Sequence, residues 1–235
     1  MTRRYFAPDL ISQRAPITLD RDESAHAIRV MRLEIGDAID LFDGLGNEAT
    51  GKVIDLSRDR CVCQMEPPVA VDREPTRSLT LAISLPKPDR AKEMVARLTE
   101  LGVIRVVPIV TERTQREPST ALLSKLERGV TEACKQSGRN CLMSIDEPRP
   151  LERLLEDCSD DANASLWVAA PGRRLFDSDR VQAQRVWTIV GPEGGLNERE
   201  MTACEDAGWE AVSLGRRILR IETAAVAVAA RVLTD

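Results

Sequence analysis

The sequence lacks most of the patterns from which metal sites, disulfide frameworks and membrane spans are built. It holds one histidine, and none of its six cysteines has the Cys-x-x-Cys spacing of zinc or redox sites. No apolar run approaches the roughly 18 residues of a membrane-spanning helix, and the N-terminal segment MTRRYFAPDL lacks the apolar core of a signal peptide. We therefore expect a soluble cytoplasmic protein with no metal site, no membrane contact and reduced, structural cysteines.

Two common nucleotide-binding patterns are absent as well. A Walker loop requires Lys followed by Ser or Thr after its second glycine, and a dinucleotide site requires the spacing Gly-x-Gly-x-x-Gly. The glycine-rich loop GPEGGLNE at 191–198 satisfies neither pattern. Triphosphates and NAD are therefore disfavoured as ligands.

This glycine-rich loop belongs to the segment WTIVGPEGGLNERE, which reads as a strand, a tight loop and the start of a helix. The strand over 188–190 stops at Gly191, and Asn197 with the acidic residues after it is typical of a helix N-cap and first turn. Gly208 is placed to end that helix. The chain must turn sharply between the strand and the helix.

The segment VSLGRRILRIETAA at 212–225 repeats the same plan about 25 residues later. Its strand is followed by Gly215, and Glu222 and Thr223 lead into the alanine-rich helix AAVAVAARVL. Ligands of open α/β sheets bind at the carboxyl ends of the strands, so two such loops side by side predict a pocket. Bare backbone with Ile218 and Leu219 would suit an adenine, although GPEGG is equally consistent with an ordinary tight turn.

The sequence GPEGG after an apolar strand, followed by LGRRILRIETA, resembles the end of the SPOUT class of RNA methyltransferases. More narrowly it is similar to the RsmE family, which methylates N3 of a uridine in 16S ribosomal RNA. Similar segments occur in the expected order through nearly the whole chain: RRYF, HAIRVMRLEIGDAIDLFDGLG, LPKPDR, TELGV and EACKQSGR. Two departures are Arg216 in place of the usual Pro and Ile221 in place of Thr, which affect details of the cofactor loop.

The resemblance implies S-adenosyl-L-methionine as cofactor, 16S ribosomal RNA of the small subunit as substrate, and a homodimer. It also implies a deep trefoil knot, which physical reasoning alone would not predict because knots are nearly absent from proteins. The residues expected to bind the cofactor are Val190, Gly191, Pro192, Glu193, Gly194, Gly195, Leu214, Gly215, Ile218, Leu219 and Thr223.

Arg220 and Glu222 are the candidate catalytic residues. Uracil N3 attacks well only as its proton is lost, so the enzyme must stabilise charge that develops on the uracil oxygens, and Arg220 is expected to do this. A salt bridge from Arg220 to Glu222 or Glu193 is the structural alternative. Glu222 would accept the proton if burial made its carboxylate basic, or else it caps the helix. The lone His26 is expected to be structural or to contact RNA.

The chain divides into two domains near VDREPTRS at 71–78. Residues 1–72 show short alternating segments with a turn at 43–46, which predicts a small β-barrel or half-barrel. Residues 77–235 begin with a strand–helix–strand unit, in which Asp89 caps the helix, and predict an α/β domain with a largely parallel sheet. The resemblance implies a PUA-like RNA-binding barrel and a SPOUT methyltransferase domain.

The net charge of −5 is unfavourable for contact with RNA phosphates. Residues 87–139, however, carry eleven Lys or Arg against seven acids, whereas residues 145–187 carry six against nine. We expect this uneven distribution to form a basic face, or else solvated helix faces with ion pairs. The candidate phosphate contacts are Arg4, Arg29, Arg32, Arg113 and Arg139. An adaptor that has lost turnover and a methyltransferase of another RNA, such as transfer RNA, remain open.

Overall fold

The computed structural model describes residues 3–12, 16–158, 163–177, 181 and 183–234. The chain forms two compact units, and each is assembled from two stretches of sequence. The N-terminal unit contains residues 1–74 and 131–142, and the C-terminal unit contains residues 75–130 and 143–235. The long helix α3 (Thr120–Ser137) begins in the C-terminal unit, and its residues from Thr131 onward belong to the N-terminal unit.

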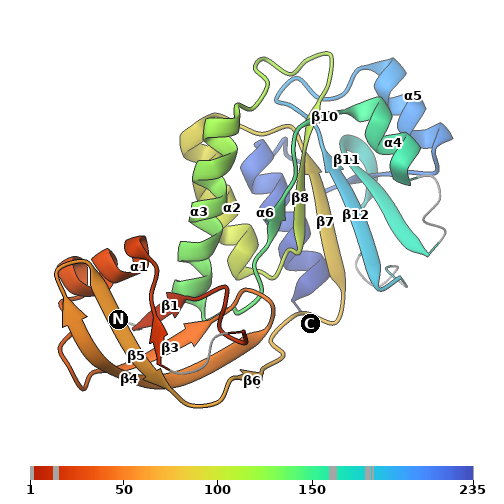
Figure 1. Ribbon diagram of the computed structural model, residues 1–235. Helices are drawn as coiled ribbons and strands as arrows, with labels where there is room; N and C mark the ends of the chain where they lie inside the picture. The colour runs from red at the N-terminus through yellow and green to blue at the C-terminus, as the bar shows by residue number, and fades with distance from the viewer. Residues whose placement is uncertain (1–2, 13–15, 159–162, 178–180, 182, 235) are drawn as a thin grey trace. The chain divides into compact units, whose positions relative to one another are not determined.

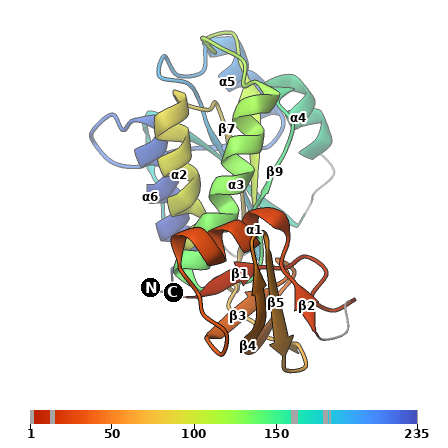
Figure 2. The ribbon, with the colours of Figure 1, turned by 60° about the vertical axis from the view of Figure 1, so that its left-hand side comes forward.

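The N-terminal unit is built on a mixed six-stranded sheet with the order β1-β3-β4-β5-β2, in which β6 pairs with β4 (Figures 1 and 2). The strands are β1 (Arg4–Phe6), β2 (Ile17–Thr18), β3 (Ala38–Phe42), β4 (Asn47–Ser57), β5 (Arg60–Met65) and β6 (Val69–Ala70). β3 and β4 pair antiparallel across the turn at 43–46, which confirms the predicted hairpin. This sheet is the half-barrel that the alternating segments predict.

A short helical segment covers the core of the N-terminal unit. The helix α1 (Arg21–Ala25) continues directly into a π-helical turn, η1 (His26–Val30). Apolar side chains of the strands and of η1 form one core, which includes Tyr5, Leu41 and Val53. All six cysteines of the chain are free thiols, and five of them are buried, as expected for structural residues.

The C-terminal unit is an α/β domain in which all the strand pairings of the described residues are parallel (Figure 1). Its sheet has the order β10-β8-β7-β12-β11-β13, and β9 pairs with β8. The strands are β7 (Ser78–Ile83), β8 (Arg105–Val110), β9 (Ser144–Ile145), β10 (Arg149–Pro150), β11 (Ala164–Leu175), β12 (Arg185–Val190) and β13 (Glu210–Ser213). The predicted parallel sheet is confirmed.

Helices cover both faces of this sheet, which explains why its central strands β7, β8 and β12 are mostly apolar rather than alternating between apolar and polar residues. α2 (Pro88–Glu100) and α6 (Ile221–Leu233) pack against each other, and α6 lies on β7 and β12 (Figures 1 and 2). α4 (Leu151–Cys158) and α5 (Glu198–Asp206) share a second core with the opposite face. None of the helices in the described part of the chain is long and apolar enough to cross a membrane.

Two predicted helix starts are wrong by a few residues. Lys87, not Asp89, is the N-cap of α2, because Pro88 takes the first helical position and Asp89 falls in the first turn. α6 begins at Ile221, so Glu222 and Thr223 lie inside its first turn rather than before it. The other helix boundary signals hold: Asn197 is the N-cap of α5, and the chain leaves that helix just before Gly208.

Candidate functional site

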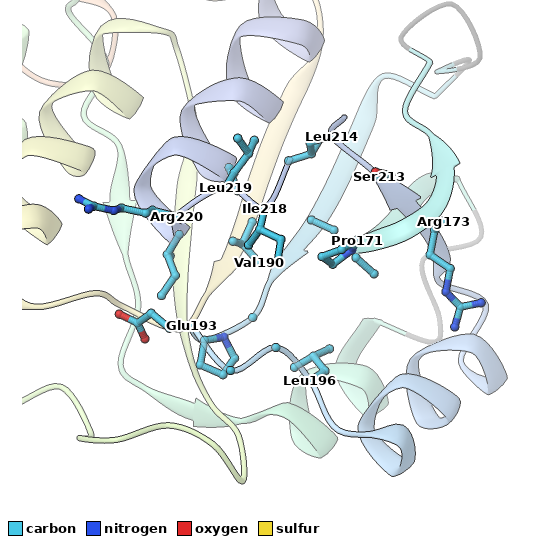
Figure 3. Close-up of a pocket in the computed structure, with 18 of the residues that line it drawn as sticks. Pro171, Arg173, Val190, Glu193, Leu196, Ser213, Leu214, Ile218, Leu219 and Arg220 are labelled. Carbon is cyan, nitrogen blue, oxygen red and sulfur yellow. The ribbon is translucent and has the colours of Figure 1, made fainter. Parts of the chain in front are cut away.

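A pocket of about 600 Å³ opens at the carboxyl ends of three neighbouring parallel strands, β12, β11 and β13 (Figure 3). Three chain segments, within residues 169–173, 190–196 and 213–224, line it together with Met201 of α5. Its volume lies within the range of about 300–1,000 Å³ that is typical of small-molecule sites. The two glycine-containing loops that the sequence analysis singled out therefore do lie side by side.

The first loop leaves β12 at Gly191 and enters α5 at Asn197. The backbone N–H of Gly195 donates to the carbonyl of Pro192 over 2.8 Å, and Gly195 has a φ of +70°, which other residues seldom adopt. Asn197 and Glu200 then form a reciprocal capping box, in which each side chain accepts the other residue's backbone N–H over 2.8 Å. The Pro192–Gly195 hydrogen bond and the Asn197–Glu200 capping box together fix the path of this loop.

A second network braces the same loop from the segment that follows β8. Glu200 is buried, and its two carboxylate oxygens accept from the backbone N–H groups of Glu112 and Asn197, each over 2.8 Å. The side chain of Asn197 donates to the carboxylate of Glu112 over 2.7 Å. Arg113 donates to the carbonyl oxygen of Gly194 over 2.6 Å. The glycine loop is therefore held by partners more than eighty residues away in sequence.

The second loop runs from Leu214 to Arg220 between β13 and α6. The hydroxyl of Ser213 donates to the carbonyl oxygen of Gly215 over 2.9 Å, which tightens the start of the loop. Ile218 is 84% exposed although it is a large apolar residue, and it lies at the pocket together with Leu219 (Figure 3). An exposed aliphatic side chain at a pocket offers a surface on which a planar ligand can pack.

The third lining segment, residues 169–173 of β11, was missed by the sequence analysis. β11 pairs with β13 twice, and Ala169 and Arg174 both register with Val212, so residues 170–173 bulge out between them. Pro171 and Arg173 of this bulge line the pocket (Figure 3). The Pro-Gly dipeptide at 171–172 inside an apolar strand was the available signal, because it marks a break in strand pairing.

Ten of the eleven residues predicted to bind the cofactor line this pocket. The exception is Thr223, which is exposed on the first turn of α6 and outside the lining. The ten are Val190, Gly191, Pro192, Glu193, Gly194, Gly195, Leu214, Gly215, Ile218 and Leu219.

The two predicted catalytic residues lie in different surroundings. Arg220 lines the pocket at the N-cap of α6, and in Figure 3 its guanidinium points away from Val190 and Pro171. Among the described residues, no carboxylate forms an ion pair with Arg220. Glu222 is outside the pocket lining and faces Arg90 of α2, with 3.8 Å between Oε1 and Nε. Glu222 therefore joins the first turns of α2 and α6.

The five arginines predicted to contact RNA divide by exposure. Arg4 and Arg139 are buried in the N-terminal unit, where Arg4 bonds to Glu48 over 2.7 Å and Arg139 to Glu74 over 2.8 Å. Burial raises the pKa of Glu48, but hydrogen bonds from Arg4 and Arg73 outweigh it and hold that pKa below its ordinary value. Both buried arginines are thus engaged inside the protein.

The remaining three arginines, Arg29, Arg32 and Arg113, are exposed. Arg29 lies in η1 and pairs with Asp59 over 2.7 Å, whereas Arg32 follows η1 with a φ of +50°, a conformation that is rare for a residue with a side chain.

His26 begins η1 and packs edge-on against Tyr5, with 6.1 Å between the ring centres. In the part of the chain that the structure describes, no three His, Cys, Asp or Glu side chains are grouped to hold a metal ion.

Comparisons with known proteins agree with this architecture. Residues 72–233 match the RNA methyltransferase domain family, and residues 19–66 match the RNA methyltransferase PUA domain family, which confirms the PUA-like nature of the half-barrel. A ribosomal RNA small subunit methyltransferase E from Synechocystis is 32% identical over 98% of this chain and 76% of its own length.

Two solved structures of similar proteins contain the cofactor. The ribosomal RNA small subunit methyltransferase E of Neisseria gonorrhoeae bound to S-adenosyl methionine is 27% identical, with a TM-score of 0.87 over 98% of this chain and 96% of that one. A methyltransferase structure from Legionella pneumophila in complex with the same cofactor is 25% identical, with a TM-score of 0.87 over 99% and 97% of the two chains. The chain therefore belongs to the RNA methyltransferase family of ribosomal RNA small subunit methyltransferase E.

Proposed function

We propose that this protein transfers a methyl group from S-adenosyl-L-methionine to N3 of a uridine in the 16S ribosomal RNA of the small ribosomal subunit. The observation that carries the proposal is the pocket formed by the GPEGG loop and the loop over 214–220, in a chain of this family. Two details of the proposal rest on the resemblance to RsmE enzymes: that the methylated base is a uridine, and that the methyl group goes to its N3 atom.

The lining of the pocket fits an adenosyl cofactor. The loop over 191–195 presents bare backbone, which can pair with the hydrogen-bonding edge of an adenine, while Ile218 and Leu219 provide apolar surface for its faces. The rigid path of the loop, fixed by Glu200 and Arg113, means that little conformational entropy would be lost on binding. We assign the pocket residues of these two loops to cofactor binding on this basis.

The chemistry requires a methyl donor and a nucleophile whose charge is stabilised. Bound S-adenosylmethionine supplies an electrophilic methyl group on a sulfonium. Arg220 has no carboxylate partner among the described residues, so its charge is available for the uracil oxygens as N3 releases its proton to solvent. Glu222 is held by Arg90, and this contact favours a positioning role for Glu222 over that of a general base.

We assign RNA contacts away from the reacting base to the N-terminal unit, and catalysis to the C-terminal unit. Arg29 and Arg32 are the two exposed candidates of the half-barrel for phosphate contacts. The proposal places the enzyme in the cytoplasm and includes a homodimer, for which the resemblance is the support. Within one chain the apolar face of α6 already packs on α2, β7 and β12, so the composition of α6 adds nothing to the case for a dimer.

The test is methyl transfer from labelled S-adenosylmethionine to small ribosomal subunits from a strain that lacks the enzyme. The modified nucleoside is identified by mass spectrometry of RNA fragments. We expect N3-methyluridine at one position of 16S RNA. Cofactor binding without transfer to ribosomal RNA would reject this substrate and direct the search to transfer RNA, and absence of cofactor binding would indicate an adaptor.

A further inference from the structure

Three cations gather at the adjoining ends of α2 and α6: Lys87, Arg90 and Arg220, which we call the α2–α6 basic cluster. Lys87 is the N-cap of α2, Arg220 is the N-cap of α6, and neither side chain forms a capping hydrogen bond. Arg90 lies in the first turn of α2 and reaches Glu222 in the first turn of α6, with 3.8 Å between the charged atoms. The cluster therefore spans the starts of two helices that pack together.

The charges of this cluster are only partly compensated within the protein. Of the carboxylates in the described chain, Glu222 alone forms an ion pair with any of the three cations. Each N-cap position normally holds a residue whose oxygen accepts a backbone N–H, and the start of a helix favours negative charge. Each helix has one acidic residue in its first turn, Asp89 in α2 and Glu222 in α6, but both N-caps are basic, which breaks the N-cap preference twice in one place. Such local exceptions are expected at functional sites rather than at random.

The cluster lies beside the pocket. Arg220 is itself a lining residue. The segment LPKPDR, which carries Lys87 and Arg90, begins two residues after the end of β7. β7 pairs with β12, and the glycine loop follows the end of β12. Ser84, the residue before this segment, donates its backbone N–H to the carbonyl of the lining residue Val190 over 3.0 Å. An anion held by Lys87 and Arg90 would thus be a neighbour of whatever occupies the pocket.

We propose that Lys87 and Arg90 bind a backbone phosphate of the substrate RNA next to the target nucleotide, while Arg220 faces the base. This inference rests on the proposed function, because it takes RNA as the substrate. Glu222 would hold Arg90 in the orientation that the phosphate requires. The cluster also explains how a chain with a net charge of −5 can hold RNA at its site, since the phosphate contact is made by a local excess of cations.

The test measures the equilibrium binding of unmodified 16S ribosomal RNA at several KCl concentrations. The proteins are the wild type, Lys87→Gln, Arg90→Gln and the control Lys92→Gln, which removes the same charge from an exposed position of α2. We expect each cluster variant to bind about tenfold more weakly at 0.1 M salt. The slope of log K against log salt should become shallower by about 0.7 per variant, as for one lost phosphate contact in a single strand. The control should match the wild type.

Two further readouts keep the inference separate from the proposed function. Affinity for S-adenosylmethionine should be unchanged in all variants, and Lys87→Gln carries the test if Arg90→Gln disturbs the fold through Glu222. If the cluster variants show the same RNA affinity and the same slope of log K against log salt as Lys92→Gln, the phosphate site is overturned, even if the wild type methylates 16S RNA. The opposite result is that the wild type transfers no methyl group but the cluster variants still bind RNA more weakly. This result would support the phosphate site and reject the proposed reaction.

Discussion

The replacement of Glu200 by Gln tests whether the glycine loop is held from outside the pocket. Glu200 is 6% exposed and uses both carboxylate oxygens, one for the N–H of Glu112 and one for the N–H of Asn197. Glutamine keeps the size and one acceptor but places an NH₂ group against the other donor. One charge-assisted hydrogen bond is lost, and a backbone N–H is left without this partner.

The expected cost follows from these contacts. A hydrogen bond to a charged group contributes about 1.5–3 kcal/mol, so Glu200→Gln should lower the free energy of unfolding by about 2–3 kcal/mol. The matched control is Glu198→Gln, which removes the same charge from an exposed position in the first turn of the same helix. Loss of its favourable position near the helix N-terminus costs about 0.5 kcal/mol. The difference of about 2 kcal/mol corresponds to a Tm lower by roughly 4–8 °C.

Calorimetry and cofactor titration check this prediction together. Glu200→Gln should melt earlier than Glu198→Gln, and its affinity for S-adenosylmethionine should fall about tenfold because the loop over 191–197 loses its brace. The control should bind the cofactor like the wild type. Equal melting temperatures and equal affinities for the two variants would refute the argument that this buried carboxylate positions the loop.

Three further predictions follow. A side chain at Gly194 would start 3.2 Å from Cδ of Arg113, so Gly194→Val should reduce cofactor affinity at least 100-fold with an unchanged circular dichroism spectrum; unchanged affinity would remove this loop from the site. Arg220→Ala should lower kcat about 100-fold or more while the Kd for the cofactor stays within about threefold, and unaffected kcat would make Arg220 structural. Lys135→Met should destabilise the protein by about 3–5 kcal/mol, because it leaves Glu23 buried without its partner. Burial raises the pKa of Glu23 and the hydrogen bond from Lys135 lowers it, so without Lys135 the ionised carboxylate is harder to keep buried. The loss of unfolding free energy in Lys135→Met should therefore be larger at pH 7 than at pH 5. Denaturant titrations that show the same loss at both pH values would contradict this.

Local signals predicted the parts of the fold that depend on neighbouring residues. The turn at 43–46, the N-cap Asn197 and the end of α5 all follow from a few adjacent residues whose backbone needs are specific. The pocket followed from one general rule, because parallel strands bring their carboxyl ends to the same edge of the sheet. These predictions needed no knowledge of distant contacts.

The contacts that brace the site could not be predicted in the same way. Arg113 reaches Gly194 across 81 positions, and Glu200 reaches Glu112 across 88. Nothing in either local sequence marks the other, since a surface arginine and a first-turn glutamate are common residues. Arg4, predicted as a surface contact, illustrates the same limit, because composition does not reveal that a carboxylate of β4 lies opposite it.

The bulge in β11 is an intermediate case. Its Pro-Gly dipeptide at 171–172 is a local signal, but a strand with such a break resembles a strand that ends. The pairing on both sides of the break, where Ala169 and Arg174 both meet Val212, is visible only once β13 is placed beside it. The knot stays a prediction from the resemblance to the family.

The most direct test of the account is the identity of the base that this protein methylates. Small ribosomal subunits from a strain without the enzyme are incubated with the protein and labelled S-adenosylmethionine, and the 16S RNA is digested and analysed by mass spectrometry. The account predicts one N3-methyluridine, formed by the wild type and at least 100-fold more slowly by Arg220→Ala. A methyl group on a ribose or on another base would contradict the proposed chemistry, and transfer by Arg220→Ala at the wild-type rate would contradict the proposed site.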